Sequence, residues 1–326
     1  MKKNIALIAG GDSGEHNISI LSSNEIEKNI DPKLYNVYKI VLRGRDWYYK
    51  DKDGRIDVDK NDFSITINNK HIVFDAAFII IHGSPGENGL LQGYLEMMGV
   101  PFTTPSSLVS ALTFDKVICN SIVREFGVVE LAQNLSVYED TAVDTKAITN
   151  KLGLPIFVKP SQGGSSIGMS KVNHSEELMP AIQRALEEHS KVIIEEFIEG
   201  RELTCGVIST RDEVIAFPIT EIITNNEFFD YEAKYEGNSE EITPANISDS
   251  LRDEIQLKSK ELYKLLDCRG VVRFDYIYNE SESKLFFLEV NTIPGQSQAS
   301  IVPQQVREMG WTTKDLYSKL LEEIFR

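Results

Sequence analysis

Hydrophobic and polar residues alternate along the chain with two different periods, and each period predicts a type of element. Short apolar runs predict buried strands, whereas apolar residues repeating every three or four positions predict helices. In the first hundred residues the order is a strand at Asn4–Ala9, a helix at Glu15–Ile30, a strand at Val37–Leu42, a hairpin at Trp47–Val58, a strand at Phe78–Ile81 and a helix at Gly89–Met98. Strands separated by helices indicate an α/β fold with a largely parallel sheet.

A break at residues 100–105, which contain two prolines, separates this region from the rest of the chain. Beyond the break, the pattern predicts helices at Ser106–Phe126, Glu176–His189, Ser248–Leu266 and Lys314–Ile324. Strands are predicted at Leu154–Lys159, Met169–Val172, Val192–Phe197, Val271–Tyr278 and Leu285–Val290. From Arg201 onward the pattern is mostly that of strands, with a polar interruption at Thr224–Asn246.

Composition narrows the class of protein. Fifty acidic against 34 basic residues give a net charge of −16, which argues against a nucleic-acid backbone as the main partner. Three cysteines without a close pair argue against a disulfide framework. The apolar run near the N-terminus is too short for a secretory signal, and no run approaches the ~20 apolar residues of a membrane span. We therefore expect a cytoplasmic protein.

A glycine-rich segment, QGGSSIG at residues 162–168, follows the predicted strand that ends with Lys159. Adjacent glycines let backbone N–H groups approach an anion closely, and the ammonium of Lys159 is placed to reach the same phosphate. The segment lacks the Lys-Ser/Thr pair of a Walker loop. Taken alone, it is as compatible with an ordinary flexible hairpin as with phosphate binding.

Oxygen-bearing side chains gather near the C-terminus. Glu289 and Asn291 are two residues apart on one predicted strand, and Arg273 and Asp275 are two apart on the strand before it. A spacing of two places both members of each pair on one face. Carboxylate and amide oxygens suit Mg²⁺ or Mn²⁺, and an arginine beside them suits a phosphoryl group or an oxyanion. The alternative is a solvated face of salt bridges on an edge strand.

Two acids, Glu195 and Glu202, flank the apolar pair Phe197-Ile198 at the end of a predicted strand. Backbone groups at such a place can read an adenine edge while a carboxylate binds the ribose hydroxyls. Surface acids give the same pattern, so this indication is weak by itself.

Two glycine turns, in GGDSGEHNIS and HGSPGENG, each lead from a strand end to a helix start and bring Glu15 and Glu87 there. Carboxylates near helix N-termini are favoured by the helix dipole. The functional alternative is an anionic pair that receives a substrate ammonium. His16 and His82 have no partner spaced as in a zinc site, so zinc is rejected.

The polar stretch FFDYEAKYEGNSEEITP, residues 228–244, has no steady period. A structureless loop of this size inside a compact domain is often a lid over an active site. Lys234 and Tyr235 would be carried onto bound substrate, and Phe228 and Phe229 would supply the packing that closes the lid.

Seven segments, in this order, resemble the D-alanine–D-alanine ligase family, a branch of the ATP-grasp enzymes. They read GGDSGEHNISILS, HGSPGENGLLQGYLEMMGVPFTTPSSLVSALTFDK, LPIFVKPSQGGSSIGMSKV, VIIEEFIEGRELT, FFDYEAKY, RGVVRFDY and LEVNTIPGQSQASIVP. Each motif alone is loose, but together they cover nearly the whole chain. The resemblance implies an N-terminal Rossmann-like domain with an open parallel sheet (1–104), a central ATP-grasp subdomain with the glycine-rich loop (105–197) and a C-terminal ATP-grasp subdomain with lid and metal site (198–326).

The resemblance also implies roles for the matching residues. ATP would be bound by Lys116, Lys159, Glu195, Phe197, Ile198, Glu202, Phe228, Lys234 and Leu288. Two magnesium or manganese ions would be bound by Asp275, Glu289 and Asn291. Arg273 and the N–H of Gly295 would stabilise an oxyanion, while Glu15, Ser165 and Tyr235 would hold the first D-alanine. His82, Ser300 and Ile301 would line the substrate sites, with Ser300 on the carboxylate of the second D-alanine.

The implied reaction makes D-alanyl-D-alanine for peptidoglycan precursors. ATP would convert one D-alanine into an acylphosphate, and the amine of a second D-alanine would displace phosphate. Family members commonly form homodimers, so a homodimer is expected.

Three other interpretations compete with this one. Another ATP-grasp ligase, for D-Ala-D-Ser or a different D-amino acid, would share the lysines and metal ligands. A nicotinamide oxidoreductase requires a G-x-G-x-x-G turn after the first strand, which GGDSGE does not supply. A catalytically dead nucleotide-binding module would lack metal ligands that this sequence retains.

Tyr235 generates a prediction about the second substrate. Relatives that make a depsipeptide with D-lactate tend to lack the lid tyrosine, so Tyr235→Phe is expected to raise the use of D-lactate relative to D-alanine. Product partitioning between the two nucleophiles at fixed pH measures this, and an unchanged ratio would refute it.

Overall fold

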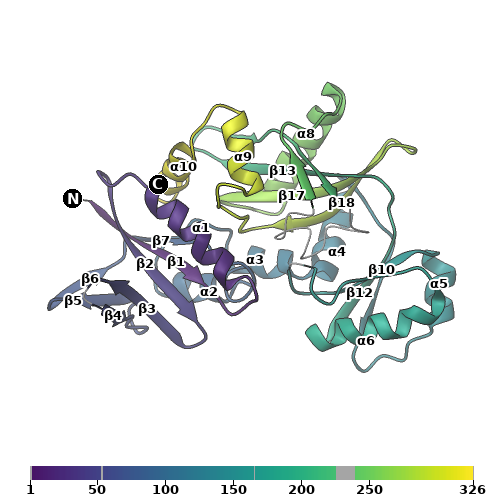
Figure 1. The fold of residues 1–326 in the computed structure, drawn as a ribbon, viewed down its shortest axis with the longest axis horizontal. Helices are drawn as coiled ribbons and strands as arrows, with labels where there is room; N and C mark the ends of the chain where they lie inside the picture. The colour runs from purple at the N-terminus through teal and green to yellow at the C-terminus, as the bar shows by residue number, and fades with distance from the viewer. Residues whose placement is uncertain (1, 53, 165, 225–238, 326) are drawn as a thin grey trace.

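The computed structural model describes residues 2–52, 54–164, 166–224 and 239–325. The predictions that concern Ser165, Phe228, Phe229, Lys234 and Tyr235 lie outside the described residues. The remainder forms three main sheets with helices on their faces (Figure 1).

The N-terminal sheet has the strand order β4-β3-β2-β1-β7. The central strands β1 (Lys3–Gly10), β2 (Tyr35–Arg43) and β7 (Ala76–Ile79) are parallel, because helix α1 (His16–Asn29) and longer segments connect them. The predicted hairpin forms the antiparallel edge strands β3 (Asp46–Asp51) and β4 (Gly54–Asp57). The sheet is therefore parallel only in its centre. A separate ribbon of β5 (Ser64–Ile67) and β6 (Lys70–Val73) precedes β7, and α2 (Leu90–Met97) follows it.

The central sheet is antiparallel throughout, in the order β11-β10-β12-β9. Its strands are β9 (Asn134–Tyr138), β10 (Ile156–Pro160), β11 (Ser170–Val172) and β12 (Lys191–Glu196). Helices α5 (Thr145–Leu152) and α6 (Leu178–Glu188) bury one face of it in a small apolar core (Figure 1). The short 3₁₀ helix η1 (Ser175–Glu177) leads into α6.

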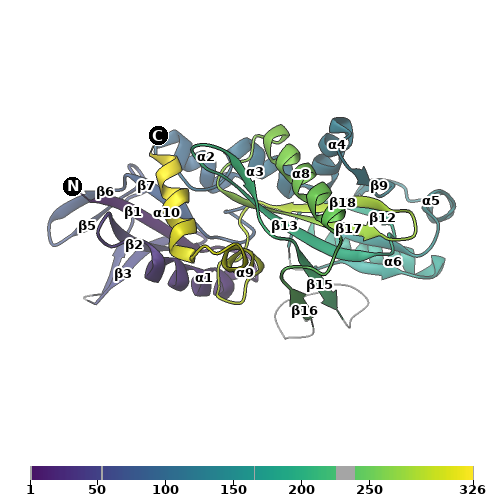
Figure 2. The same ribbon diagram turned by 90° about the horizontal axis from the view of Figure 1, so that it is seen from above.

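The C-terminal sheet has the order β16-β15-β13-β17-β18-β8, with β14 (Val214–Ala216) paired to β13. Its other strands are β8 (Glu130–Leu131), β13 (Arg201–Ser209), β15 (Thr220–Thr224), β16 (Ser239–Ile242), β17 (Val271–Asn279) and β18 (Lys284–Asn291). In Figure 2, β15 and β16 extend from one side of the molecule. Because β16 lies inside the predicted polar loop, that loop is not wholly structureless, and the backbone pairing with β15 explains the difference.

The predicted helix over Ser106–Phe126 is wrong as a single element, because it breaks at Asp115 into α3 (Ser107–Phe114) and α4 (Lys116–Phe126). Asp115 has extended backbone angles, and its carboxylate accepts the N–H of Ile118 at 3.2 Å as the cap of α4. Asp115 is 3% exposed, and its carboxylate binds Lys191 of β12 and Ser161, which follows β10. This tertiary pairing outweighs the apolar helical pattern.

Several helices pack against a sheet that is formed by a distant part of the chain. Val109 of α3 and Val123 of α4 are buried in the core of the C-terminal sheet. At the other end of the chain, α9 (Ile301–Glu308) leads to α10 (Thr313–Ile324), which packs against α1 and the N-terminal sheet (Figure 1). The Tyr317 ring meets Phe78 of β7 edge-on, with centroids 5.6 Å apart.

Two further features concern the whole fold. Within the described ranges, no helix is both long enough and apolar enough to cross a bilayer. All three cysteines are buried free thiols.

Tyr317 provides a test of how far the C-terminal helix stabilises the N-terminal domain. The side chain is fully buried, so Tyr317→Ala should lower the free energy of unfolding by about 3–5 kcal/mol, as measured by urea denaturation. Tyr317→Phe removes only the hydrogen bond to Gln296 and should cost about 1 kcal/mol. A loss below 1 kcal/mol for Tyr317→Ala would contradict this account.

Candidate active site

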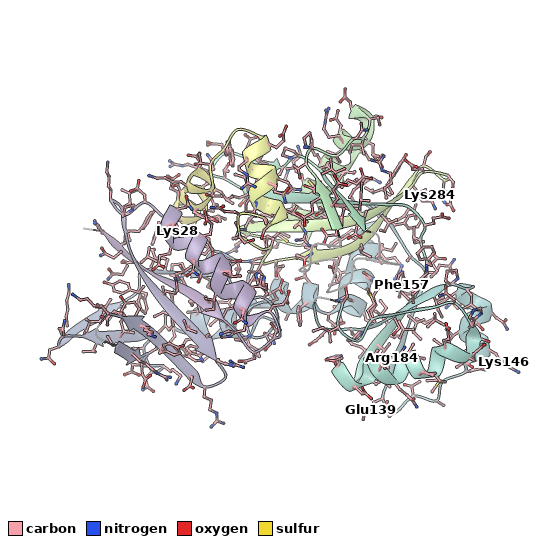
Figure 3. All side chains as sticks on the ribbon, viewed as in Figure 1. Lys28, Glu139, Lys146, Phe157, Arg184 and Lys284 are labelled. Carbon is pink, nitrogen blue, oxygen red and sulfur yellow. The ribbon has the colours of Figure 1, made fainter. Side chains whose placement is uncertain are left out.

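A cavity of about 790 Å³ lies between the central and C-terminal sheets and reaches the N-terminal domain. Phe157 of β10 lies on the side of its sheet that faces this cavity (Figure 3). Apart from Asp275, which lies behind the wall, every described residue with a role implied by the resemblance lines the cavity: Glu15, His82, Lys116, Lys159, Glu195, Phe197, Ile198, Glu202, Arg273, Leu288, Glu289, Asn291, Gly295, Ser300 and Ile301.

Lys159 and Glu195 form a buried ion pair at the cavity wall of the central sheet. The antiparallel register pairs Phe157 with Glu195, so Lys159 lies diagonally across from Glu195 on the same face, with Nζ 2.8 Å from Oε2. Asn120 of α4 donates to the other carboxylate oxygen at 2.9 Å. Burial alone would lower the pKa of Lys159, but the charge and hydrogen bond of Glu195 raise it, so the ammonium stays charged. Glu195 therefore holds Lys159 toward the cavity.

The segment after β12 forms the apolar end of the cavity. The ring of Phe197 lies 5.9 Å from that of Phe157, and Lys171 lies over Phe197 at 4.5 Å. The backbone N–H of Phe197 donates to the carbonyl of Pro155 at 3.2 Å. Because this N–H is already bonded, a planar base bound here would contact the remaining backbone groups of residues 197–198. Glu202 of β13 lies in the same wall of the cavity.

Lys116 links the glycine-rich loop to Glu289 of β18. Its Nζ donates to the carbonyl of Gly163 at 2.9 Å and lies 3.9 Å from Oε2 of Glu289. Gly163 has a φ of +129°, a conformation that side chains rarely adopt. Lys116 is also the first residue of α4, immediately after the break at Asp115, so the break sets the direction of its side chain.

The acidic cluster follows from the register of two neighbouring strands. β17 and β18 pair Arg273 with Asn291 and Asp275 with Glu289, with a bulge after Asp275. All four side chains therefore lie on one patch of the sheet, as the spacing of two predicts.

Asp275 is the centre of this patch and is 3% exposed. Its carboxylate accepts two hydrogen bonds from the Arg273 guanidinium and one from the Asn291 amide, all at 2.8 Å, and a fourth from Thr204. Asp275 raises the pKa of Arg273 despite the burial that opposes its charge. The guanidinium is thus fixed in direction and always charged.

A divalent metal ion fits this donor set in part. Glu289 and Asn291 reach the cavity, and because the Asn291 amide nitrogen faces Asp275, its oxygen is left for another partner. Asp275 must exchange some of its hydrogen bonds before it binds a cation. Among the described residues there is no cluster of three or more His, Cys, Asp or Glu that would bind a metal alone, so ligand oxygens have to complete the coordination.

The loop at residues 292–300 closes the cavity on the side of the N-terminal domain. A Cβ at Gly295 would lie 2.8 Å from the Ser300 hydroxyl, so a larger residue at this position would displace the Ser300 side chain. Ser300 precedes α9 and accepts from the N–H of Ser297 at 3.1 Å. Gln296 anchors the loop, because its N–H donates to Ser22 of α1 and its side chain accepts from Tyr317 of α10.

The N-terminal domain contributes Glu15, His82 and Glu87 to the cavity. Glu15 precedes α1, and its Oε2 would lie 3.1 Å from a Cβ at Gly164, so it borders the glycine-rich loop. Glu87 accepts the N–H of Gly83 at 2.8 Å.

The surroundings of three residues in or near the cavity, Glu87, Lys191 and Glu241, do not follow from the sequence. The turn HGSPGENG drew attention to Glu87, but only the structure shows its burial. The pairing of Lys191 with Asp115 and the position of Glu241 on β16 could not be predicted from the sequence. Both depend on contacts between distant segments.

The buried pair of Lys159 and Glu195 predicts a stability effect. Glu195→Gln leaves a buried ammonium without its counter-charge and should lower the free energy of unfolding by about 3 kcal/mol in urea denaturation. Adding Lys159→Met should recover most of that loss. Glu196→Gln is the matched control on the same strand, since Glu196 accepts a backbone N–H from Gln133, and it should cost less than about 1 kcal/mol. Equal losses for both single variants would contradict the prediction.

Sequence comparisons match this architecture to known proteins along its whole length. The family model described as "D-ala D-ala ligase N-terminus" matches residues 4–105, and that described as "D-ala D-ala ligase C-terminus" matches residues 123–322. A D-alanine--D-alanine ligase of Bacteroides fragilis is 44% identical over 326 residues, covering 100% of both chains. That of Christiangramia forsetii is 44% identical over 323 residues, covering 99% of this chain and 98% of its own.

Solved structures agree with the sequence comparisons. The VanG D-Ala:D-Ser ligase from Enterococcus faecalis superposes with a TM-score of 0.87 at 31% identity, covering 99% of each chain. A D-alanine--D-alanine ligase from Bacillus anthracis superposes with a TM-score of 0.81 at 30% identity, covering 99% of this chain and 98% of that one. A second structure from Bacillus anthracis, at 28% identity, is complexed with ATP. The chain, with its ATP-grasp fold, therefore belongs to the D-alanine–D-alanine ligase family.

Proposed function

We propose that this chain joins two D-alanine molecules into D-alanyl-D-alanine at the expense of ATP, as a step toward peptidoglycan precursors. The observation that carries the proposal is the cavity itself. It brings Lys116 and Lys159, the Arg273 patch and the Ser300 loop to one space between three parts of the fold. We also expect a homodimer in the cytoplasm, as the family resemblance implies.

The first step activates a carboxylate. Oxide is a poor leaving group, so the carboxylate of the first D-alanine takes the γ-phosphoryl group of ATP and becomes an acylphosphate. Lys116 and Lys159 supply fixed positive charge to the phosphates, and the glycine-rich loop supplies backbone N–H groups. Glu289 and Asn291, with Asp275, would bind two Mg²⁺ or Mn²⁺ ions, whose chemistry is to offset the negative charge of the triphosphate.

The second step forms the amide bond. The neutral amine of the second D-alanine attacks the acylphosphate carbonyl, and phosphate leaves with the electron pair of the broken C–O bond. The guanidinium of Arg273 and the N–H of Gly295 would stabilise the oxyanion, and loss of one such donor usually costs about 3–4 kcal/mol. Ser300, at the start of α9, would bind the second carboxylate, where helix N–H groups favour an anion.

A D-Ala-D-Ser ligase is the second candidate, because the VanG enzyme shares this fold at 31% identity. The D-alanine--D-alanine ligases of several bacteria are more similar, at 43–44% identity over the full chain, which favours D-alanine as the second substrate. The side chain of Ile301 adds an apolar group to the wall beside Ser300, which suits a methyl better than a hydroxymethyl group.

An assay of phosphate release from ATP tests the proposal. D-Alanine should stimulate release strongly and yield a dipeptide by mass, whereas L-alanine should give no product, and D-serine and D-lactate should give little. Strong ATP hydrolysis without a dipeptide, or a preference for D-serine, would count against D-alanine ligation.

A further inference from the structure

Asp115, at the break between α3 and α4, binds more partners than a helix cap requires. Its Oδ1 atom accepts the N–H of Ile118, which caps α4, and also the hydroxyl of Ser161 at 2.6 Å. Its Oδ2 atom lies 2.5 Å from Nζ of Lys191 and accepts from the Gln162 amide at 3.4 Å. A cap needs only the first of these contacts, so the other three require a separate explanation.

The backbone connects the same three segments. The N–H of Lys116 donates to the carbonyl of Ser161 at 2.8 Å, and the N–H of Ser161 donates to the carbonyl of Lys191 at 2.8 Å. Ser161 and Gln162 lead from β10 into the glycine-rich loop. The start of α4, the entry to the glycine-rich loop and the start of β12 are therefore joined at one point, with the carboxylate of Asp115 at its centre.

This junction is buried although it contains two charges. Asp115 is 3% exposed and Ser161 is fully buried. Burial alone would raise the pKa of Asp115, but the hydrogen bonds from Lys191 and Ser161 lower it, so the carboxylate stays charged. Hydrogen bonds to a charged acceptor are stronger than those between neutral groups. The carboxylate is therefore fixed in position and direction.

The groups that the junction fixes face the cavity, while Asp115 lies behind them. Lys116 follows Asp115 directly, and its Nζ donates to the carbonyl of Gly163 at 2.9 Å. Lys116, Gln162 and Gly163 all line the cavity. The Lys116 ammonium and the N–H groups of the glycine-rich loop are the donors assigned to the phosphates of ATP. They belong to segments far apart in the chain, so their separation has to be set by a contact between those segments.

We propose that Asp115 is a positioning residue for the phosphates of ATP, which holds Lys116 and the entry to the glycine-rich loop at a fixed separation through its Oδ1 atom. The Oδ2 atom and Lys191 balance each other's buried charge. This inference rests on the proposed function, since it requires that the cavity binds ATP. Asp115 acts only through its neighbours. Without it, the lysine and the loop would have to be brought together at the moment of binding.

Ligands with and without phosphates distinguish positioning from a general loss of structure. Asp115→Ala should weaken the binding of a non-hydrolysable ATP analogue about 10–100-fold in calorimetric titration, because small displacements of positioning groups have effects of that size. Adenosine has the same base and ribose but no phosphates, so its affinity should change less than about twofold. If both ligands are weakened equally, Asp115 only supports the fold and the inference is wrong.

A conservative double variant tests Oδ1 separately from the charge. Asp115→Asn keeps an oxygen for Ile118 and Ser161, and Lys191→Met removes the ammonium that would otherwise face the new amide. Exchange of a buried ion pair for uncharged groups is often neutral, so the double variant should bind the ATP analogue within about threefold of the wild type. An affinity as low as that of Asp115→Ala would contradict the role of Oδ1.

Ser161→Ala removes only the hydroxyl donor and leaves the cap and the ion pair in place. It keeps the proposal testable if Asp115→Ala fails to fold. We expect it to weaken the ATP analogue about 3–10-fold, the loss of one hydrogen bond to a charged group, with adenosine unchanged. An unchanged affinity for the analogue in this variant would contradict the proposal.

Asp144→Ala is the matched control, because Asp144 caps α5 of the same sheet by accepting the N–H of Ala147 at 3.0 Å. It should lower the melting temperature but leave the affinity for the ATP analogue unchanged. If the wild type makes the dipeptide but Asp115→Ala binds the analogue as Asp144→Ala does, this inference is wrong and the proposed function stands. If the wild type neither binds the analogue nor makes the dipeptide, both fall together.

Discussion

The antiparallel register between β17 and β18 is the constraint on which the rest of the site depends. It places Arg273 opposite Asn291 and Asp275 opposite Glu289, so a guanidinium, two carboxylates and an amide share one patch. Side chains alternate between faces along a strand, and a slip of one residue would turn the patch into the core of the sheet. Buried Phe274 and Tyr276 occupy that opposite face and oppose such a slip.

Three of the described cations that line the cavity each lie near a carboxylate. Lys159 pairs with Glu195, Arg273 with Asp275, and Lys116 approaches Glu289. A strongly acidic chain thus keeps a local positive site in which these three cations are balanced by carboxylates. The pairing fixes the direction of each cation before an anionic ligand enters, which reduces the reorganisation that binding requires.

The sequence predicts those parts that follow from local periodicity. The spacing of two in Arg273–Asp275 and Glu289–Asn291 predicts paired strands with one polar face, and the structure has both. The break at Asp115 was not predictable, because it depends on Lys191, which lies 76 residues away in sequence at the start of β12. Likewise the pairing of Glu195 with Lys159 depends on a register between separate strands. The raised pKa of Glu87 depends on burial and on the charges of Glu15 and Glu289, which only the fold brings near it.

The position of α10 has a consequence for how the protein is made. Leu316, Tyr317 and Leu320 belong to the same apolar core as Ile5 and Ile8 of the first strand. The ribosome releases these residues only after every other helix and strand described here has been made. Until then, the sheet built first has one apolar face uncovered. The N-terminal domain therefore cannot complete its core until α10 has been translated, and chaperones that bind exposed apolar surface have access to it until then.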